Sequence, residues 1–179
     1  MACISKLASA IAYDCDSGAT GLVSAIIINK ADIASFVVTT SDSSVSALTL
    51  APGATPFKID VVKRSLVVSA SLKINDGAPN AYSHSASIIQ TLNDANSARA
   101  SLDAFANGSF VILAKWAGRV SAEVYGLYYG LSATAVENNS HDNGGWTTIT
   151  LETPENVIGE DTLKARDSVY ASLLAAAIG

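Results

Sequence analysis

The chain has 179 residues, of which 49% are hydrophobic and only 15% are charged, and its formal net charge is −5. This composition argues against a nucleic-acid-binding groove, which needs clustered Lys and Arg, and the sequence contains no apolar run of the 18 residues that a membrane-spanning helix requires. Ordinary domains carry roughly 25% charged residues, so we expect either an extracellular protein or a protein whose surface is largely covered by copies of itself.

Residues 1–20 predict an N-terminal arm that belongs to the mature protein, because the segment lacks the apolar core and cleavage site of a signal peptide. Cys3 and Cys15 could pair if this arm folds back. We favour two reduced thiols, as in cytosolic proteins. Asp14 and Asp16 flank Cys15 in a turn and are interpreted as solvated loop residues.

Apolar runs rich in β-branched residues predict strands at Leu22–Ile28, Ile33–Thr40 and Val45–Leu50. The segment 29–32 predicts a turn, and the Pro- and Gly-containing segment 51–56 ends this part of the chain. The first third of the sequence is therefore expected to be strands joined by short connections.

Two alternating polar-apolar runs follow, at Phe57–Ile74 and Asn80–Leu92. A period of two predicts strands with one buried face, and Asp76-Gly77 between the runs predicts a hairpin. Strands usually have five or six residues, so a hairpin of about twice that length is expected to protrude from a small domain. Such a hairpin needs a partner that continues its sheet.

The clearest helical pattern covers Ala95–Asn107, with Asn96 or Ser97 as the N-cap and Gly108 as the stop. Phe110–Trp116 and Val120–Tyr125 then predict a second hairpin.

Gly126 and Gly130 indicate bends in a strand pattern that continues to Glu137. Trp146–Glu152 predicts the last strand, and Asp161–Ile178 has helical composition. The fold class is therefore mainly β: a β-sandwich or barrel with a long protruding hairpin, one short α-helix and a possible C-terminal helix. We divide the chain into the arm 1–20, a β-domain 21–155 and a C-terminal extension 156–179.

Neither His84 nor His141 predicts catalysis. His84 lies in a strand pattern with Ser83 and Ser85 on the opposite face, so no nucleophile lies within reach of its ring. We expect His84 to be a surface or interface residue and the protein not to be an enzyme, with no metal site and no cofactor. A cluster of carboxylates near the end of the chain is interpreted as a solvated loop: Glu152, Glu155, Glu160 and Asp161.

Aromatic residues gather in the second half of the chain and allow two interpretations. At alternating strand spacing, they are expected to form core and subunit contacts. They could instead stack on bases or sugars. The residues are Tyr125, Tyr128, Tyr129 and Trp146.

The order of elements resembles that of bacteriophage tail-tube proteins, in which a long hairpin is followed by one helix and further strands. In particular, a helix followed by an apolar strand and an aromatic-Gly stretch is similar to the tail-tube type of phages of Bacteroidetes-like hosts. The resemblance covers about half of the chain. It is carried by SLVVSASLKIND, AYSHSASIIQTL, ARASLDAFANGSFVILAKWAGRVSAEVYGLYYGLSATAVE and GWTTITLETPE.

The resemblance implies a structural virion protein whose hexameric rings stack into a tube that conducts DNA without binding it specifically. The tube would belong to the phage tail, assembled in the bacterial cytoplasm with other tail proteins and with no membrane partner. The side chains expected to face the lumen or the wet side are Ser69, Ser71, Ser83, Ser85 and Ser87, with Leu66, Val68, Leu72 and Ile88 facing the core.

Contacts between stacked rings are expected at the hairpin tip, at the arm 1–20 and at the tail 161–179. The tip residues are Asn75, Asp76, Gly77 and Pro79. A competing hypothesis is a secreted or surface β-sandwich that binds carbohydrate or a host receptor through Tyr128, Tyr129 and Trp146. A hydrolase that depends on His84 is the least favoured interpretation.

Overall fold

A computed structural model describes residues 21–61, 65–90, 96–138 and 146–178. The expected mainly-β class is confirmed: the described residues form eleven strands, two α-helices and a single-turn 3-10 helix, Lys30–Asp32. The strands are β1 Leu22–Asn29, β2 Ile33–Thr39, β3 Ser44–Leu50, β4 Phe57–Ile59, β5 Leu66–Lys73, β6 Ala81–Gln90, β7 Ser109–Trp116, β8 Ala122–Tyr125, β9 Leu131–Asn138, β10 Thr147–Glu152 and β11 Leu163–Ala165, and the helices are α1 Asn96–Asn107 and α2 Asp167–Ala176.

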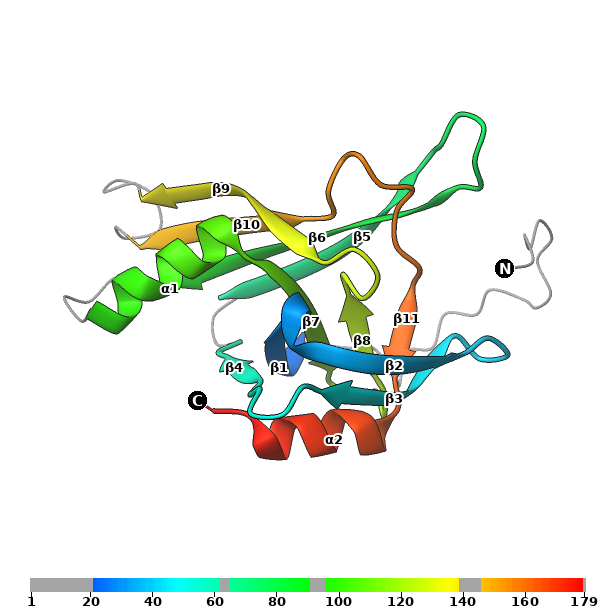
Figure 1. The fold of residues 1–179 in the computed structure, drawn as a ribbon, viewed down its shortest axis with the longest axis horizontal. Coiled ribbons are helices and arrows are strands. Elements are labelled where there is room, and N and C mark those ends of the chain that lie inside the picture. The colour runs from blue at the N-terminus through cyan, green and yellow to red at the C-terminus, as the bar shows by residue number, and fades with distance from the viewer. Residues whose placement is uncertain (1–20, 62–64, 91–95, 139–145, 179) are drawn as a thin grey trace.

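The strands form one sheet that folds over on itself. Its order is β2-β3-β11-β8-β7-β9-β10-β6-β5, and β1 joins it by pairing with β7 and β4. In Figure 1, β9, β10, β6 and β5 make an upper layer above the remaining strands, α1 lies beside the upper layer, and α2 lies beneath β3. The fold-over occurs between β7 and β9, which share only the two pairs Ser109↔Ser132 and Phe110↔Leu131.

Strand β7 is buried on both faces and divides the interior into two cores. Phe110 and Ile112 pack against the upper layer, whereas Val111 and Leu113 pack against β8, β11 and α2. All four side chains are at most 5% exposed. A strand covered on both sides needs a continuous apolar run, which explains the sequence FVIL.

The C-terminal residues belong to the same folded unit as the β-domain. β11 lies between β3 and β8, and Leu163 and Ala165 are buried in the second core. Tyr170 and Leu173 of α2 are buried there as well. The expected C-terminal helix therefore forms and packs on this domain. None of the helices among the described residues is long and apolar enough to cross a membrane.

The expectation of one uninterrupted run from Phe57 to Ile74 is wrong. β4 pairs with β1, while β5 pairs with β6, so the two strands belong to different parts of the sheet. Between them, the Ser65 hydroxyl donates to the Asp60 carbonyl. The hairpin therefore has limbs of 8 and 10 residues, Leu66–Lys73 and Ala81–Gln90.

Residues 153–160, which we call the strap, hold the outer part of the hairpin along its β6 side. The Thr153 amide donates to the His84 carbonyl, and Glu160 and Tyr82 exchange backbone hydrogen bonds of 2.7 and 2.9 Å. The Lys73 ammonium donates to the Val157 carbonyl at 2.6 Å. The hairpin tip protrudes from the body, as expected, but the strap accompanies it (Figure 1).

Glu160 corrects the expectation of a solvated acidic loop, because its side chain is only 1% exposed. Its two carboxylate oxygens accept hydrogen bonds from the amides of Tyr128 and Tyr129, at 2.9 and 2.7 Å. Burial raises the pKa of Glu160, and these amides and the charge of Lys30 oppose that rise. Glu160 thereby joins the strap to the turn that precedes β9.

We expect Glu160→Gln to lower the free energy of unfolding by about 1–3 kcal/mol, because an amide nitrogen cannot accept the hydrogen bond that one carboxylate oxygen now accepts. Urea denaturation at neutral pH measures the change. Glu155→Gln, on the exposed part of the strap, is the control and should change stability by less than about 0.5 kcal/mol. Equal losses for both variants would contradict this role of Glu160.

Candidate functional site

The upper layer presents a face lined with hydroxyl groups to the outside; we call it the outer face. The strand registers place Ser69 opposite Ser85 and Ser71 opposite Ser83. The Ser69 and Ser85 hydroxyls are 2.8 Å apart, within hydrogen-bond distance. Ser87 extends the row and lies opposite Thr150 of β10.

All five serines expected on the wet side therefore lie on one face. Ser69 and Ser71 are exposed, and the other three are half-buried. Thr148 and Thr150 of β10 belong to the same face, and sequence reasoning missed them. They are about sixty residues from the hairpin in the chain, so only the β6–β10 pairing reveals that they join it.

Charged groups are sparse on the outer face. By register, the described charged residues on it are Lys73, Glu137 and Glu152. The Lys73 ammonium is already hydrogen-bonded to strap carbonyls, including that of Glu155 at 3.0 Å. The face is therefore hydroxyl-rich and slightly acidic, a surface that offers little to a phosphate backbone.

The opposite face of the hairpin covers the core only at its base. Leu66, Val68 and Ile88 are buried, as expected. Leu72 was expected to face the core and is instead 59% exposed. The outer half of the hairpin overhangs the lower layer, so Leu72 and the neighbouring Tyr82, 37% exposed, lack a covering layer.

The outer edge of β5 has no neighbour among the described residues. In an antiparallel hairpin, residue pairs that exchange backbone hydrogen bonds alternate with pairs that do not. The Ile89 amide donates to the Ser65 carbonyl, so this pair and every second pair from it toward the hairpin tip exchange hydrogen bonds within the hairpin. The backbone groups of Leu66, Val68, Ala70 and Leu72 consequently point away from β6. β5 contains no proline, and its single charged residue is Lys73.

The other side of the same four strands is also open in part. β9 pairs with β7 only through Leu131 and Ser132, whereas its pairing with β10 runs from Ser132 to Asn138. Beyond Ser132, the described part of the chain therefore leaves the far edge of β9 without a strand partner. Among the described residues, β5 and β9 are thus the two edge strands of this layer; β5 lacks a neighbour along its edge, whereas α1 packs against β9.

The four hairpin-tip residues expected to make ring contacts lie together at the end of the hairpin. Asp76, Gly77 and Pro79 are exposed. Asn75 is half-buried, and its side-chain Nδ2 donates to the Pro79 and Ile158 carbonyls at 2.9 Å each. Gly77 has φ 77°, a conformation that favours glycine.

His84 is not a surface residue, as the sequence suggested, but is 1% exposed. Its Nδ1 accepts a hydrogen bond from the Gly126 amide at 3.1 Å, so the neutral ring carries its proton on Nε2. Burial lowers the pKa of His84 to about 4, against the opposing charge of Glu123. The ring is therefore neutral at physiological pH.

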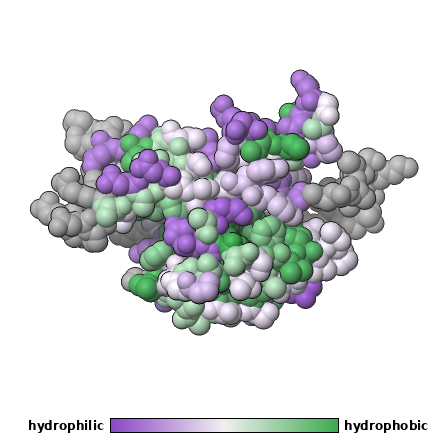
Figure 2. Space-filling model, in the orientation of Figure 1, coloured by the Kyte–Doolittle hydropathy of each residue, from purple (hydrophilic) through white to green (hydrophobic). Residues whose placement is uncertain are grey.

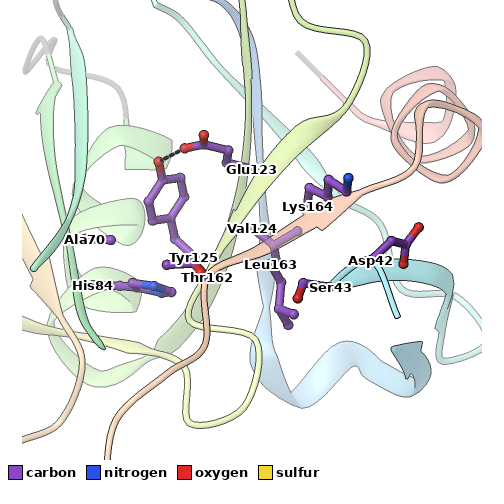
Figure 3. A pocket seen from close by; sticks show the side chains of 10 residues that line it. All are labelled: Asp42, Ser43, Ala70, His84, Glu123, Val124, Tyr125, Thr162, Leu163 and Lys164. Carbon is purple, nitrogen blue, oxygen red and sulfur yellow. Dashed lines mark hydrogen bonds between the residues drawn. The ribbon is translucent and has the colours of Figure 1, made fainter. Parts of the chain in front are cut away.

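His84 lines a pocket of about 250 Å³ where the hairpin leaves the body (Figure 3). Tyr125 packs edge-on against its ring, with centroids 5.3 Å apart, and donates a hydrogen bond to Glu123 at 2.6 Å. Arg119 pairs with the same carboxylate. The pKa of Tyr125 is raised by burial and by Glu123. This arrangement holds Glu123 in place and gives His84 a structural role at the hairpin base.

The exposed aromatic residues do not form one platform. Tyr128 packs edge-on against Phe36, with ring centroids 5.7 Å apart. Trp146 immediately precedes β10, whereas Tyr128 and Tyr129 precede β9 at the Glu152 end of β10. Since β10 is six residues long, Trp146 and the tyrosine pair lie at opposite ends of that strand.

Several expectations fall outside the described residues: the arm 1–20, the state of Cys3 and Cys15, and the loop with His141. The described residues contain no group of three or more His, Cys, Asp or Glu side chains that could hold a metal ion. Comparison of the chain with protein-family models, with curated proteins and with solved structures finds no match.

We expect the stability of the protein to fall as the pH drops from about 6.5 to about 4, because unfolded His84 takes up a proton in this range and folded His84 does not. The loss between pH 7 and pH 4.5 should be about 2 kcal/mol, from the size of the pKa difference. His84→Asn keeps an acceptor for Gly126 but cannot titrate, so its urea-unfolding free energy should lack this part of the pH dependence. Identical pH profiles for both proteins would contradict the assignment.

Proposed function

We propose that the chain is the repeating structural subunit of a tube, in which copies join side by side into rings and the rings stack. The observation that carries this proposal is the four-stranded layer β9-β10-β6-β5, which combines a hydroxyl-lined outer face with an edge strand on each side that lacks a further strand partner over most of its described length. The hexameric ring and the role in a phage tail are proposals from the sequence resemblance.

Pairing between β5 of one copy and β9 of the next would satisfy the outward backbone groups of both strands. An open edge strand with few charges is a template for association, and ring closure removes every such edge. The two edges differ, so the contact is heterologous: it generates a ring when the rotation closes and a filament when it does not.

The outer face of each layer would line the lumen of this ring. Serine and threonine hydroxyls are well hydrated, and the acidic balance of the chain repels phosphates. DNA in such a lumen would meet few of the ammonium and guanidinium groups that retain it. A binding site for DNA needs clustered positive charge, whereas a passage for DNA needs a surface without it. The outer face, with few positive charges, fits a passage.

Replacement of Ala70 by proline tests the edge contact. The Ala70 amide points away from β6, so Ala70→Pro should leave the hairpin paired but remove one donor from the joint. We expect the wild-type protein to sediment as rings or longer assemblies, and Ala70→Pro to sediment as a folded monomer. Ala70→Ser keeps the amide and should assemble. A wild-type protein that remains monomeric at all concentrations would overturn the proposal.

Charge substitution tests the lumen assignment. The triple variant Ser69→Lys, Ser71→Lys and Ser85→Lys places ammonium groups on the outer face, and we expect the assembled variant to retain DNA at low salt and to release it as salt increases. A filter-binding assay on assembled protein measures retention. Lysine at Ser168, Ala171 and Ser172, exposed positions of α2, controls for the added charge. Equal retention by both triple variants would argue against a lumen-facing sheet.

A further inference from the structure

An apolar groove of about 630 Å³ opens between α1 and the strands β1, β4 and β6, at the base of the hairpin. Its lining includes Ile27, Ile88 and Phe110, which are members of the first core. Phe105 and Ala104 line it from α1. The groove therefore reaches the first core from the surface at this end of the molecule.

The groove also contains an unsatisfied acceptor. Gln90 lines it, and the buried Gln90 Oε1 has no hydrogen-bond partner among the described residues. A buried acceptor without a donor is costly. An occupant that combines apolar side chains with an N–H donor would consequently suit this groove.

The tip end of the hairpin carries matching groups. Ile74, next to the tip, is 75% exposed, and Leu72 precedes it with its side chain uncovered. Ile158 of the strap is also exposed and lies beside the tip, since its carbonyl accepts a hydrogen bond from the Asn75 side chain. The exposed Asn80 supplies a carboxamide nitrogen as a donor. Several large apolar side chains exposed together are typical of a surface that meets another protein.

The tip and the groove lie at opposite ends of β6. This strand begins at Ala81, next to the tip, and ends at Gln90, in the groove lining, so its ten residues separate the two by about 30 Å. β6 is paired with β5 on one side and with β10 on the other, so the tip cannot reach the groove of its own chain (Figure 1). A contact between tip and groove therefore joins two copies.

The proposed ring would bring these two surfaces together. The strands of a closed barrel tilt by about 35–45° from its axis, so the two ends of each strand lie at opposite rims. Every tip would then lie at one rim of the ring and every groove near the other. When a second ring stacks in the same orientation, the tips of one ring face the grooves of the next, and the contact repeats along the stack.

We propose that the hairpin tip of a copy in one ring docks into the α1 groove of a copy in the next ring, with Ile74 as its apolar anchor. Because the contact requires rings that stack, it rests on the proposed function. The β5–β9 joint closes each ring, whereas the tip–groove contact holds successive rings together. The two contacts can consequently be disrupted separately.

Substitution at the tip tests the contact in the full chain. Ile74→Glu should leave the rings intact but reduce the fraction of stacked rings roughly tenfold, because an apolar groove excludes a carboxylate. Val120→Glu is the matched control, since Val120 is 73% exposed on the turn between β7 and β8, and it should stack like the wild type. Sedimentation and electron microscopy measure both rings and stacks.

Substitution in the groove tests the other partner. Ala104→Glu places a carboxylate on the groove wall and should give unstacked rings, as Ile74→Glu does. Ala106→Glu, exposed on α1 but outside the groove lining, is the matched control and should stack normally. Ring formation by each variant shows that it has folded.

Cross-linking tests the pairing of tip and groove directly. With Cys3 and Cys15 replaced by serine, Asp76→Cys at the tip is combined with Ala100→Cys on the exposed wall of the groove. After treatment with a short bismaleimide, denaturing electrophoresis should show a ladder of dimers and higher species. Asp76→Cys combined with Ala106→Cys should give a ladder roughly fivefold weaker, because position 106 lies outside the groove lining.

The outcomes separate this contact from the ring itself. A wild-type protein that stays monomeric would overturn the ring and the contact together. Wild-type rings that never stack, or stacks that persist in Ile74→Glu and Ala104→Glu, would overturn the contact alone. A ladder equally strong from positions 100 and 106 would overturn it as well.

Discussion

The outer edge of β5, with which no strand of the described residues pairs, is the constraint on which the account of this protein depends. Its outward amides and carbonyls lie on an exposed strand that carries one charged residue, and natural sheets rarely leave such a strand unprotected. The strap fixes the other side of the hairpin through Tyr82, Lys73 and Asn75, so the free edge is held in an extended conformation. An edge held in this way is prepared to pair with another strand.

Two layers of packing support that edge. β7, buried on both faces, anchors the upper layer to the lower sheet through the first core, while α2 and β11 complete the second core. Two buried polar groups, His84 and Glu160, then fix the base of the hairpin by binding the turn between β8 and β9. Figure 2 shows a contrast between polar surface along α1 and apolar surface gathered over β2 and β3. Exposed apolar surface of this kind, including Val37 at 55%, is common where a protein meets other molecules.

Local pattern was sufficient to predict most of the strands, α1 and the serine-lined face, because alternation and β-branched runs depend on neighbours in the sequence. The division of the long run was missed although a signal was present: Phe57, Ile59 and Val61 occupy odd positions, whereas Leu66 and Val68 occupy even ones. Such a change of parity indicates that two strands, not one, are present. The burial of His84 and Glu160 could not be predicted, because their partners Gly126, Tyr128 and Tyr129 are more than thirty residues away. The contribution of β10 to the outer face could not be predicted for the same reason, because it depends on pairing between segments that are distant in the sequence.

The central claim is that copies of this chain complete one another's sheets. A three-dimensional reconstruction of the purified, assembled protein by electron microscopy tests it most directly. The account predicts a closed ring in which β5 of each copy lies about 4.8 Å from β9 of its neighbour, the spacing of hydrogen-bonded strands, with the serine-lined face toward the lumen. Single compact particles, or rings in which β5 stays exposed to solvent and the serines face outward, would contradict it.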